Sequence, residues 1–534
     1  MGVKGKIRIL ILIATATICL FANSACPGPQ QTTTNQSGPQ VRMRWQDFIS
    51  GPDGAKRLAS LQAAVTKMKS LDNSPPGSAD YRRSWAYWAN IHGYYGQQSP
   101  DGTVEEQIQY LQQNGMSQYV SYYQGITDQT PPDSTATAVW ATCQHSAQTQ
   151  AVNFFGWHRM YLYYFERVLR WASGDNTLRL PYWDYTDASQ VALPAEFQSS
   201  TSVLYDAKRD PDMNSGASTL DPDSTNVNSL LRDSNYFDYE YKVETGIHGY
   251  VHCTVGPTCP VAHMGDVPVA GNDPIFYTHH GNIDRLWACW QHLYGTPAGS
   301  WQDQTFSFVD ETGTLQTQPV KNFLDSTTLG YVYDNDSNCA RPGFILNVPR
   351  TIPQAIPPET GPLNTALLAA SKTVNIVRPQ TAVDIEVPQA KRMNLFAQPQ
   401  GAATMELVLR DITAQSHPGV LFDVYVAKKG DASVRKLAGT ISWFGAFRHH
   451  GSKGPEKKTL SFDVTDQLRE LGGTASTTGL TVTIEATQGR VPADQSKAEA
   501  MRAVAAKAFR PQAKLQIGAI ELRQGTAPAE PEKR

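Results

Sequence analysis

The sequence predicts a mainly α-helical domain followed by an antiparallel β-sandwich-like domain, and three observations lead to this prediction. Before residue 335, apolar residues recur at helical spacing, as at Leu58, Leu61 and Val65. From about residue 380 the apolar period changes to two, as at Phe422 and Val424, which is typical of half-buried strands. Six histidines of the helical part form two triplets, so we expect a helix bundle that holds metal between its helices.

The first 40 residues are expected to lie outside the folded domains. Three basic residues precede the apolar run 9–22, and small residues follow it, which is the layout of a secretory signal over residues 1–25. Cys26 comes next, so a lipid anchor at Cys26 and plain cleavage just before it are two alternatives. Residues 26–40 are polar and Pro-rich, which indicates a disordered tether. We therefore expect an exported protein, periplasmic or extracellular, with or without a lipid anchor.

The remaining boundaries follow from composition. A chain of 534 residues predicts two or three domains. The net charge of −3 and the absence of a long basic run give no reason to expect a nucleic-acid partner. Seven prolines between residues 341 and 379 predict an extended linker. The expected order is a metal-binding domain over 41–335, a linker over 336–379, a β domain over 380–524 and a polar tail over 525–534.

The first histidine triplet is His92, His145 and His158. His158 opens a helical pattern in which Leu162 and Phe165 share its face, so its ring is expected to point into a core. His145 precedes His158 by thirteen residues, and the stretch directly after His145, Ser-Ala-Gln-Thr-Gln, is mostly polar. A loop at His145 and a helix at His158 are therefore expected.

The second triplet is His248, His252 and His280. His248 and His252 are four residues apart, so on a helix both rings face the same way and can reach one ion at ~2.0 Å. No Glu follows His248, which excludes the HExxH metalloprotease motif. Two three-histidine sets in one domain predict a dinuclear site with open coordination positions rather than a structural metal site.

The segments around the histidines resemble the type 3 copper proteins, a family of tyrosinases, catechol oxidases and oxygen carriers. The resemblance rests on FFGWHR at residues 154–159 and DPIFYTHHGNIDRLW at residues 273–287. It implies a dicopper centre, O2 as co-substrate, and oxidation of small o-diphenols to o-quinones, with hydroxylation of monophenols such as tyrosine in some members. An o-aminophenol oxidase and a non-catalytic oxygen-binding protein are the alternatives. The signal suggests a bacterial member.

The resemblance also implies roles for single residues. Glu244 would hold a water that accepts the phenol proton. His280 would be the ligand of the His279-His280 pair, with His279 beside the substrate. Gly249 and Val267 would line the substrate pocket. Phe276 would lie against a ligand ring and border the same pocket.

Four further expectations concern the surroundings of the ligands. Asn282 and Asp284 are candidates to fix the tautomer of a ligating imidazole, and a pair of Asp284 with Arg159 or Arg285 is the alternative. In fungal relatives a Cys two residues before the second histidine of the first triplet forms a thioether with that histidine. Cys143 and His145 have this spacing, and a plain cysteine at 143 is the alternative. Cys253 and Cys259 flank a Gly-Pro turn and predict a local disulfide, and Cys289 is expected to be a core thiol.

The C-terminal domain resembles that of plant polyphenol oxidases, and this resemblance implies an active-site cover. Tyr331 and Tyr333 match the Tyr-x-Tyr signature that closes the catalytic domain and packs on an N-terminal arginine, here Arg42 or Arg44. An aromatic side chain of the cover is expected to plug the site, and the candidates are Trp443, Phe444 and Phe447.

Overall fold

The structure is a computed structural model that describes residues 38–145, 153–334, 365–392, 404–446, 457–472 and 477–525. The expected signal and most of the tether, the tail beyond 525, and Phe447 lie outside these residues. Residues 39–534 form one compact unit. Among the described residues, no helix has the length and apolar character needed to cross a membrane.

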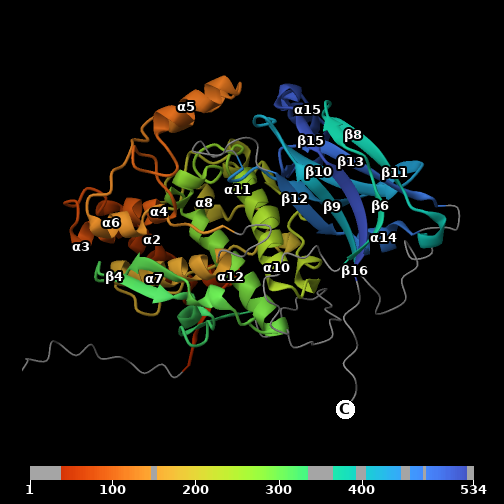
Figure 1. Cartoon of the computed structure of the whole chain (residues 1–534). Helices are drawn as coiled ribbons and strands as arrows, with labels where there is room; N and C mark the ends of the chain where they lie inside the picture. The colour runs from red at the N-terminus through yellow and green to blue at the C-terminus, as the bar shows by residue number, and fades with distance from the viewer. Residues whose placement is uncertain are drawn as a thin grey trace, which may run out of the picture. The chain divides into compact units, whose positions relative to one another are not determined.

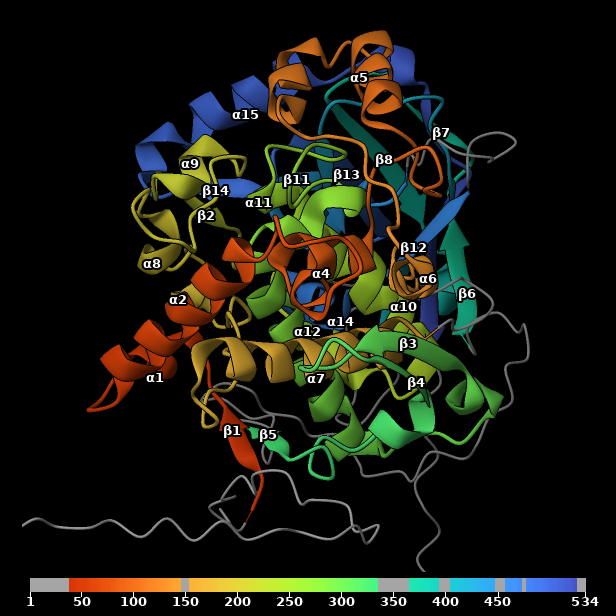
Figure 2. The same ribbon diagram turned by 90° about the vertical axis from the view of Figure 1, so that its left-hand side faces the viewer.

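The helical domain is built around two long helices, α7 and α12, each of 20 residues (Figures 1 and 2). Their aromatic side chains stack in the core, with Phe155 on Trp287 and Phe165 on Tyr277 at centroid distances of 5.5 and 3.7 Å. The helices are α1 Trp45–Ile49, α2 Gly54–Ser70, α3 Ala79–Arg82, α4 Trp85–His92, α5 Val104–Gln113, α6 Ser134–Val139, α7 Phe154–Ser173, α8 Ala195–Gln198, α9 Pro211–Asn214, α10 Tyr236–Val243, α11 Gly249–Val255 and α12 Ile275–Tyr294.

The C-terminal part is an antiparallel sandwich of two four-stranded sheets, ordered β11-β10-β13-β8 and β12-β9-β16-β6, as predicted. The alternating pattern predicted half-buried strands, but β10 is buried along nearly its whole length, and the helix Thr465–Leu471 packs against it. The elements are β6 Thr365–Ala370, β7 Val374–Ile376, β8 Gln380–Glu386, β9 Met405–Ile412, β10 Leu421–Lys428, β11 Asp431–Ile441, β12 Lys458–Asp463, α14 Thr465–Leu471, β13 Gly479–Thr487, β14 Arg490–Pro492, α15 Ala498–Ala508, β15 Leu515–Ile517 and β16 Ala519–Gly525.

The β domain begins earlier than the sequence predicted. β6 pairs with β16 and β7 pairs with β15, although both strands lie in the range 336–379 that was assigned to the linker. The prolines explain the difference, since none occurs between Pro362 and Pro379. Proline removes a ladder donor, and this proline-free stretch is where the strands form.

The N-terminal strand β1 (Gln40–Arg42) runs parallel to β5 (Tyr331–Tyr333) and closes the helical domain. The Arg42 guanidinium lies 3.6 Å from the ring centroid of Tyr331 and bonds Glu166 at 2.8 Å. Arg42, rather than Arg44, is therefore the arginine that packs on the Tyr-x-Tyr segment.

Polar contacts join the β domain to the helical domain. β14 pairs with the short strand β2 (Ser218–Leu220), and the two labels lie side by side in Figure 2. Arg490 forms an ion pair with Asp210 at 2.9 Å, and Lys242 bonds Glu406 at 3.0 Å. These contacts hold the β domain so that the segment after β11, which includes Phe444, lies over the histidines.

Candidate metal centre

Four histidines converge in the core, where the sequence predicted three. His248 ends a π-helical turn (Glu244–His248), His252 lies one turn further on α11, and His279 and His280 lie on α12. One ring nitrogen from each lies within 4.8 Å of the others, and all four side chains are buried. A π-turn inside a helix is often found at functional sites, and here it sets the direction of His248.

The rings of His248 and His252 are held in one tautomer by backbone carbonyls. His248 Nδ1 bonds the carbonyl of Glu244 at 3.1 Å, and His252 Nδ1 bonds that of Met264 at 2.7 Å. The Nε2 atoms of both rings are buried and have no hydrogen-bond partner among the described residues. Since buried polar atoms are normally bonded, these nitrogens fit a metal ion.

His279 and His280 differ in their partners. The hydroxyl of Tyr185 lies 2.8 Å from His279 Nδ1, whereas within the described part of the chain neither ring nitrogen of His280 is bonded. Tyr185 was not singled out from the sequence, because nothing near it in the chain marks it as a partner of α12. Both rings belong to the group of four histidines. A ring nitrogen of His279 therefore lies close to those of the predicted ligands, and His279 is not only a neighbour of the substrate.

The first group contains a cysteine where a histidine was expected. Ring nitrogens of His92 and His158 and the sulfur of Cys143 lie within 4.8 Å of one another. The Nδ1 atoms of His92 and His158 bond the carbonyls of Val267 and Phe154 at 3.0 and 2.7 Å. Cys143 Sγ lies 3.6 Å from His158 Nε2.

His145 is not brought together with His92 and His158. Its Nδ1 lies 2.8 Å from Glu244 Oε1, and 32% of its side chain is exposed. The reason is local: His145 belongs to a loop and not to a helix of the core. The thioether between Cys143 and His145 stays a prediction.

Burial keeps the site uncharged. It lowers the pKa of His158 to about 3, and it lowers the pKa values of His248, His252, His279 and His280 well below the usual value. A metal binds the deprotonated imidazole nitrogen, so these rings are ready for a metal at neutral pH without losing a proton.

Phe276 and Val267 lie beneath the histidines. The Phe276 ring is fully buried, with its centroid 4.3 Å from that of His280 and 4.8 Å from that of His92. It supports both groups of ligands and does not line the pocket. The carbonyl of Val267 accepts a hydrogen bond from His92, and Val267 Cγ2 lies 3.9 Å from the place that a Cβ atom at Gly445 would take.

Asp284 and Asn282 do not contact the histidines in the way that was predicted. Asp284 accepts hydrogen bonds from Arg159 at 2.6 Å and from the hydroxyls of Tyr331 and Tyr333 at 2.7 and 2.6 Å. Asn282 accepts one from Arg285 at 2.8 Å. The tautomers of four histidines are fixed by backbone carbonyls instead, so the alternative pairing of Asp284 with Arg159 is correct.

The cysteines of α11 and α12 form disulfide bonds. The predicted bond between Cys253 and Cys259 is present. Cys289 is also disulfide-bonded, so the expectation of a core thiol was wrong.

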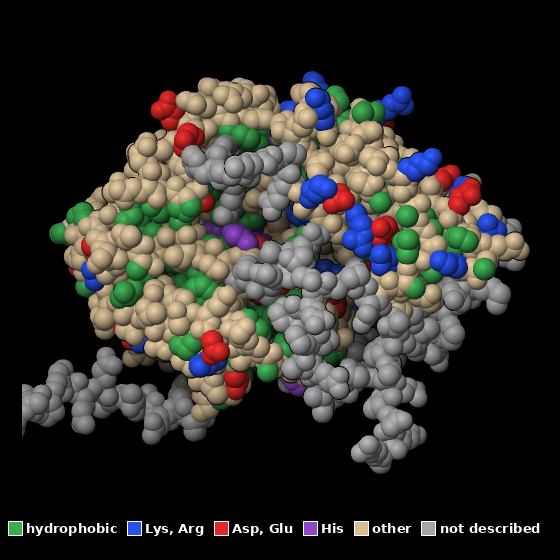
Figure 3. Space-filling model, in the orientation of Figure 1, with side chains coloured by type: hydrophobic (Ala, Val, Ile, Leu, Met, Phe, Trp, Pro, Cys, Tyr) green, Lys and Arg blue, Asp and Glu red, His purple; other side chains and the backbone are tan. Residues whose placement is uncertain are grey.

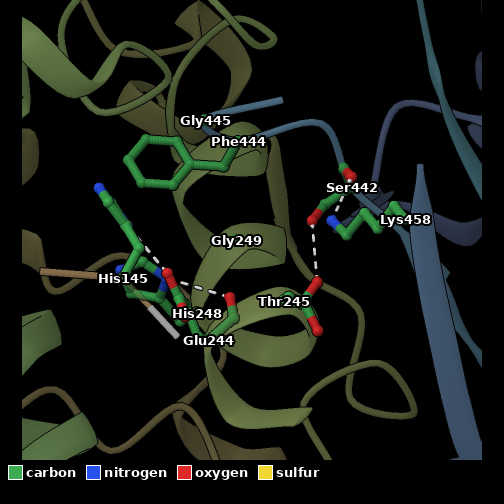
Figure 4. A pocket seen from close by; sticks show the side chains of 9 residues that line it. All are labelled: His145, Glu244, Thr245, His248, Gly249, Ser442, Phe444, Gly445 and Lys458. Atoms are coloured by element: carbon green, nitrogen blue, oxygen red, sulfur yellow. Dashed lines mark hydrogen bonds and ion pairs between the residues drawn. The ribbon is translucent and has the colours of Figure 1, made fainter. Parts of the chain in front are cut away.

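A pocket between the two domains lies directly above His248 (Figure 4). Phe444 reaches into it, and its ring lies 3.9 Å from the ring of His252, centroid to centroid. Trp443 instead packs in the β domain and donates to the carbonyl of Val420 at 2.8 Å. In the space-filling view, histidine is visible inside a recess (Figure 3). The pocket is lined by His145, Glu244, Thr245, His248, Gly249, Ser442, Phe444, Gly445 and Lys458.

A comparison with known protein families finds a match within this domain. The family described as the common central domain of tyrosinase matches residues 82–228 and 190–293, which include both histidine groups. Residues 82–293 of the helical domain are therefore similar to that central domain. Polyphenol oxidase II of Ipomoea batatas is 28% identical over 373 residues, which are 60% of this chain and 60% of the relative. A tyrosinase of a Hahella strain is 28% identical over 309 residues, covering 52% of this chain and 60% of the relative.

The similarity of folds extends through the β domain. The structure of a latent aurone synthase, a polyphenol oxidase, superposes with a TM-score of 0.57 at 20% identity and covers 92% of both chains. At that identity the likeness concerns the fold alone. The sequence matches span about 60% of the length of the curated tyrosinase-family relatives.

Proposed function

We propose that the protein is a copper-dependent oxidase that converts o-diphenols to o-quinones with O2, and that it can also hydroxylate some monophenols. The observation that supports this best is the convergence of buried imidazoles from both triplets, namely His92 and His158 from the first and His248, His252 and His280 from the second. The relatives reported above are named polyphenol oxidase and tyrosinase. These names favour phenol oxidation over o-aminophenol oxidation or simple oxygen binding.

Each of two copper ions would be held by three imidazoles. His248, His252 and His280 would hold one ion, because their nitrogens are already grouped and buried. His92 and His158 would hold the other, with His145 as the third ligand. A metal-bound imidazole commonly gives its second N–H to a carboxylate, so the bond from His145 to Glu244 is compatible with this role. The copper ions would supply O2 binding and electron transfer.

Glu244 is the base that we assign to the phenol proton. Its side chain is only 10% exposed and faces the pocket beside Gly249 (Figure 4). The carboxylate bonds His145 through Oε1, and as a base it would take up the phenol proton directly or through a water molecule. A phenolate gives up electrons more readily than the neutral phenol, so a positioned base at Glu244 would favour oxidation of the substrate.

The β domain covers the pocket and would keep the uncut chain inactive. Phe444 fills the place where a phenol ring would lie, and Ser442 donates to the carbonyl of Thr245 at 3.3 Å. Substrate entry would require that this segment move or that the domain be released. We assign the release to cleavage or loosening of the linker. Its C-terminal end lies before β6.

The setting of the protein is part of the proposal. A disulfide at Cys253–Cys259 suits an oxidising compartment, in line with export. The signal over 1–25, an anchor at Cys26, and the thioether at Cys143 stay predictions. Intact-mass measurement tests the last two, because a thioether removes two hydrogen atoms and a lipid adds the mass of its chains.

The test of the proposed function uses the purified full chain, before and after cleavage of the linker, loaded with copper. O2 uptake and quinone absorbance are measured with catechol, L-tyrosine and o-aminophenol. Catechol oxidation that needs two copper ions per chain and increases on cleavage is expected. The matched control is a His248→Ala variant, which should bind less copper and lose turnover. A chain that binds two copper ions but turns over none of the three substrates would refute the proposal.

A further inference from the structure

The segment Met264–Val267 touches one histidine from each triplet. The carbonyl of Met264 accepts from His252 Nδ1 at 2.7 Å, and the carbonyl of Val267 accepts from His92 Nδ1 at 3.0 Å. An imidazole takes its tautomer and its direction from the acceptor on its non-ligating nitrogen. Four consecutive residues therefore orient rings that belong to two different metal sites.

Asp266 lies between these two carbonyls, and it is buried. Its Oδ2 accepts hydrogen bonds from the hydroxyl of Tyr95, at 2.5 Å, and from that of Tyr123. Gln107 on α5 donates to the Tyr123 hydroxyl at 2.7 Å and to the carbonyl of Pro260 at 2.8 Å. A buried chain of hydrogen bonds thus ties the segment to α5 and to the turn that ends at Tyr123.

The backbone around Asp266 is closely packed. A Cβ atom at Gly265 would lie 2.1 Å from the carbonyl oxygen of Thr258, so the chain leaves no space for a side chain there. The amide of Asp266 also donates to the carbonyl of His263 at 2.9 Å. Because the backbone is closely packed here, a displacement of Asp266 would also move the carbonyls of Met264 and Val267.

We propose that Asp266 is a positioning residue that orients His252 and His92 together, through Met264 and Val267, and so sets the affinity of both metal sites at once. Neither the histidine motifs nor the pocket lining includes Asp266. The inference rests on the proposed function in one respect, which is that these histidines hold copper.

The test compares Asp266→Ala and Asp266→Asn in the full chain with the matched control Leu111→Ala. Leu111 is buried in the same apolar cluster as Tyr95 and Tyr123, but it makes no hydrogen bond to Asp266. Copper affinity for each of the two ions is measured by competition with a chelator, and thermal unfolding is measured without metal. We expect Asp266→Ala to lower the affinity for each of the two copper ions by about 10- to 100-fold, which is the effect typical of residues that hold metal ligands.

The two other variants separate orientation from general stability. Asp266→Asn keeps an oxygen acceptor for the tyrosine hydroxyls and should restore most of the affinity. Leu111→Ala should lower the melting temperature while both affinities stay within a factor of two or so of wild type. If Asp266→Ala does not fold, Tyr95→Phe and Tyr123→Phe, each of which removes one donor, supply the same comparison with smaller losses.

Three results would overturn the inference: wild-type affinity for both ions in Asp266→Ala, loss at one site only, or an equal loss in Leu111→Ala. A wild-type chain that fails to bind two copper ions would overturn the proposed function as well. A wild-type chain that binds two, together with unaffected Asp266 variants, would overturn this inference alone.

Discussion

The ring of Phe444 lies almost parallel to the ring of His252, at a centroid distance of 3.9 Å and an interplanar angle of 13°. It also meets the ring of His248 edge-on at 5.4 Å. Because a flat phenol would stack on the same imidazoles, Phe444 competes with substrate for one surface. The first two predictions follow from this contact.

Phe444→Ala should raise the catechol oxidase activity of the uncut chain. An aromatic pair contributes about 0.5–1.5 kcal/mol beyond its buried area, so its loss should shift the equilibrium between covered and open sites about 2- to 12-fold. Initial rates of quinone formation at low catechol concentration measure the effect. Phe509→Ala, the same truncation elsewhere in the β domain, is the control and should leave the rate unchanged. An unchanged rate in Phe444→Ala would mean that another group closes the site.

Gly249→Asn should loosen the cover from the opposite side. A Cβ atom at Gly249 would lie 2.7 Å from Ser442 Oγ and 3.4 Å from Phe444 Cβ, so the glycine allows the cover to sit close. Overpacking of this kind costs typically ~1–3 kcal/mol, which favours the open form. We expect faster catechol turnover in the uncut chain. We also expect a higher ratio of tyrosine to catechol turnover, because an amide beside Glu244 can help to hold its water. Gly249→Ala should show only the smaller, steric part of the effect; equal ratios in both variants would contradict the role of the amide.

The sequence predicted best those ligands that helical periodicity places. The four-residue spacing of His248 and His252 and the apolar face of His158 gave their directions without a structure. The partners of these rings were beyond the same reasoning. They are backbone carbonyls of residues such as Met264 and Val267, and any residue type can offer a carbonyl. The position of the His145 ring was beyond this reasoning too, because no periodicity governs a loop.

Long-range contacts explain the other differences. Asp284 lies one turn after His280, so the sequence allowed it to face either a histidine or an arginine. The choice depends on Arg42, which is 242 residues away and arrives only when β1 pairs with β5. β6 and β7 lie within the range that its seven prolines assigned to the linker, but six of these prolines precede Thr365 and the seventh, Pro379, follows Ile376.

Asp284→Asn should destabilise the fold and leave copper binding intact. Asp284 neutralises Arg42 and Arg159, whose side chains are fully buried. Removal of one partner from a buried ion pair typically costs about 3–5 kcal/mol, because the other charge stays buried. Chemical unfolding of the metal-free chain measures the loss. Asp303→Asn breaks an exposed pair with Lys321 and should cost no more than about 1 kcal/mol. Loss of copper at unchanged stability would instead favour a role beside the ligands.

His145→Ala should remove one of the two copper ions, whereas Cys143→Ser should keep both. A histidine lost from a triplet leaves two imidazoles, which is too few for a stable site of this kind. Copper content after dialysis and intact mass are the measurements. If Cys143→Ser loses an ion and His145→Ala does not, then the group of His92, Cys143 and His158 seen in the structure is the true ligand set.

Copper binding should release few protons even in mild acid. An exposed imidazole with a pKa of about 6.5 is about nine-tenths protonated at pH 5.5 and must lose that proton to bind metal. Burial holds the pKa of His158 at about 3 and those of His248, His252 and His280 well below 6.5, so these rings are already neutral there. Calorimetry of copper binding at pH 5.5, in two buffers with different heats of ionisation, counts the protons. About one proton released per ligating histidine would show that the rings are solvated before the metal enters.

The same shifts fix the sign of the effect on stability. The folded-state pKa of each of these histidines lies below that of the unfolded chain, so each contributes stability that is present above about pH 6.5. As the pH falls, the unfolded chain takes up protons that the folded chain refuses, and the loss is about 1.4 kcal/mol per pH unit for each histidine. For His158 the loss ends near pH 3. Bound copper should not add to this dependence, because rings that are already neutral in the folded chain bind the metal without competition from protons. The stability gained from copper should therefore not increase as the pH rises from 5 to 7, and a gain that increases steeply across this range would contradict the burial of the ligands.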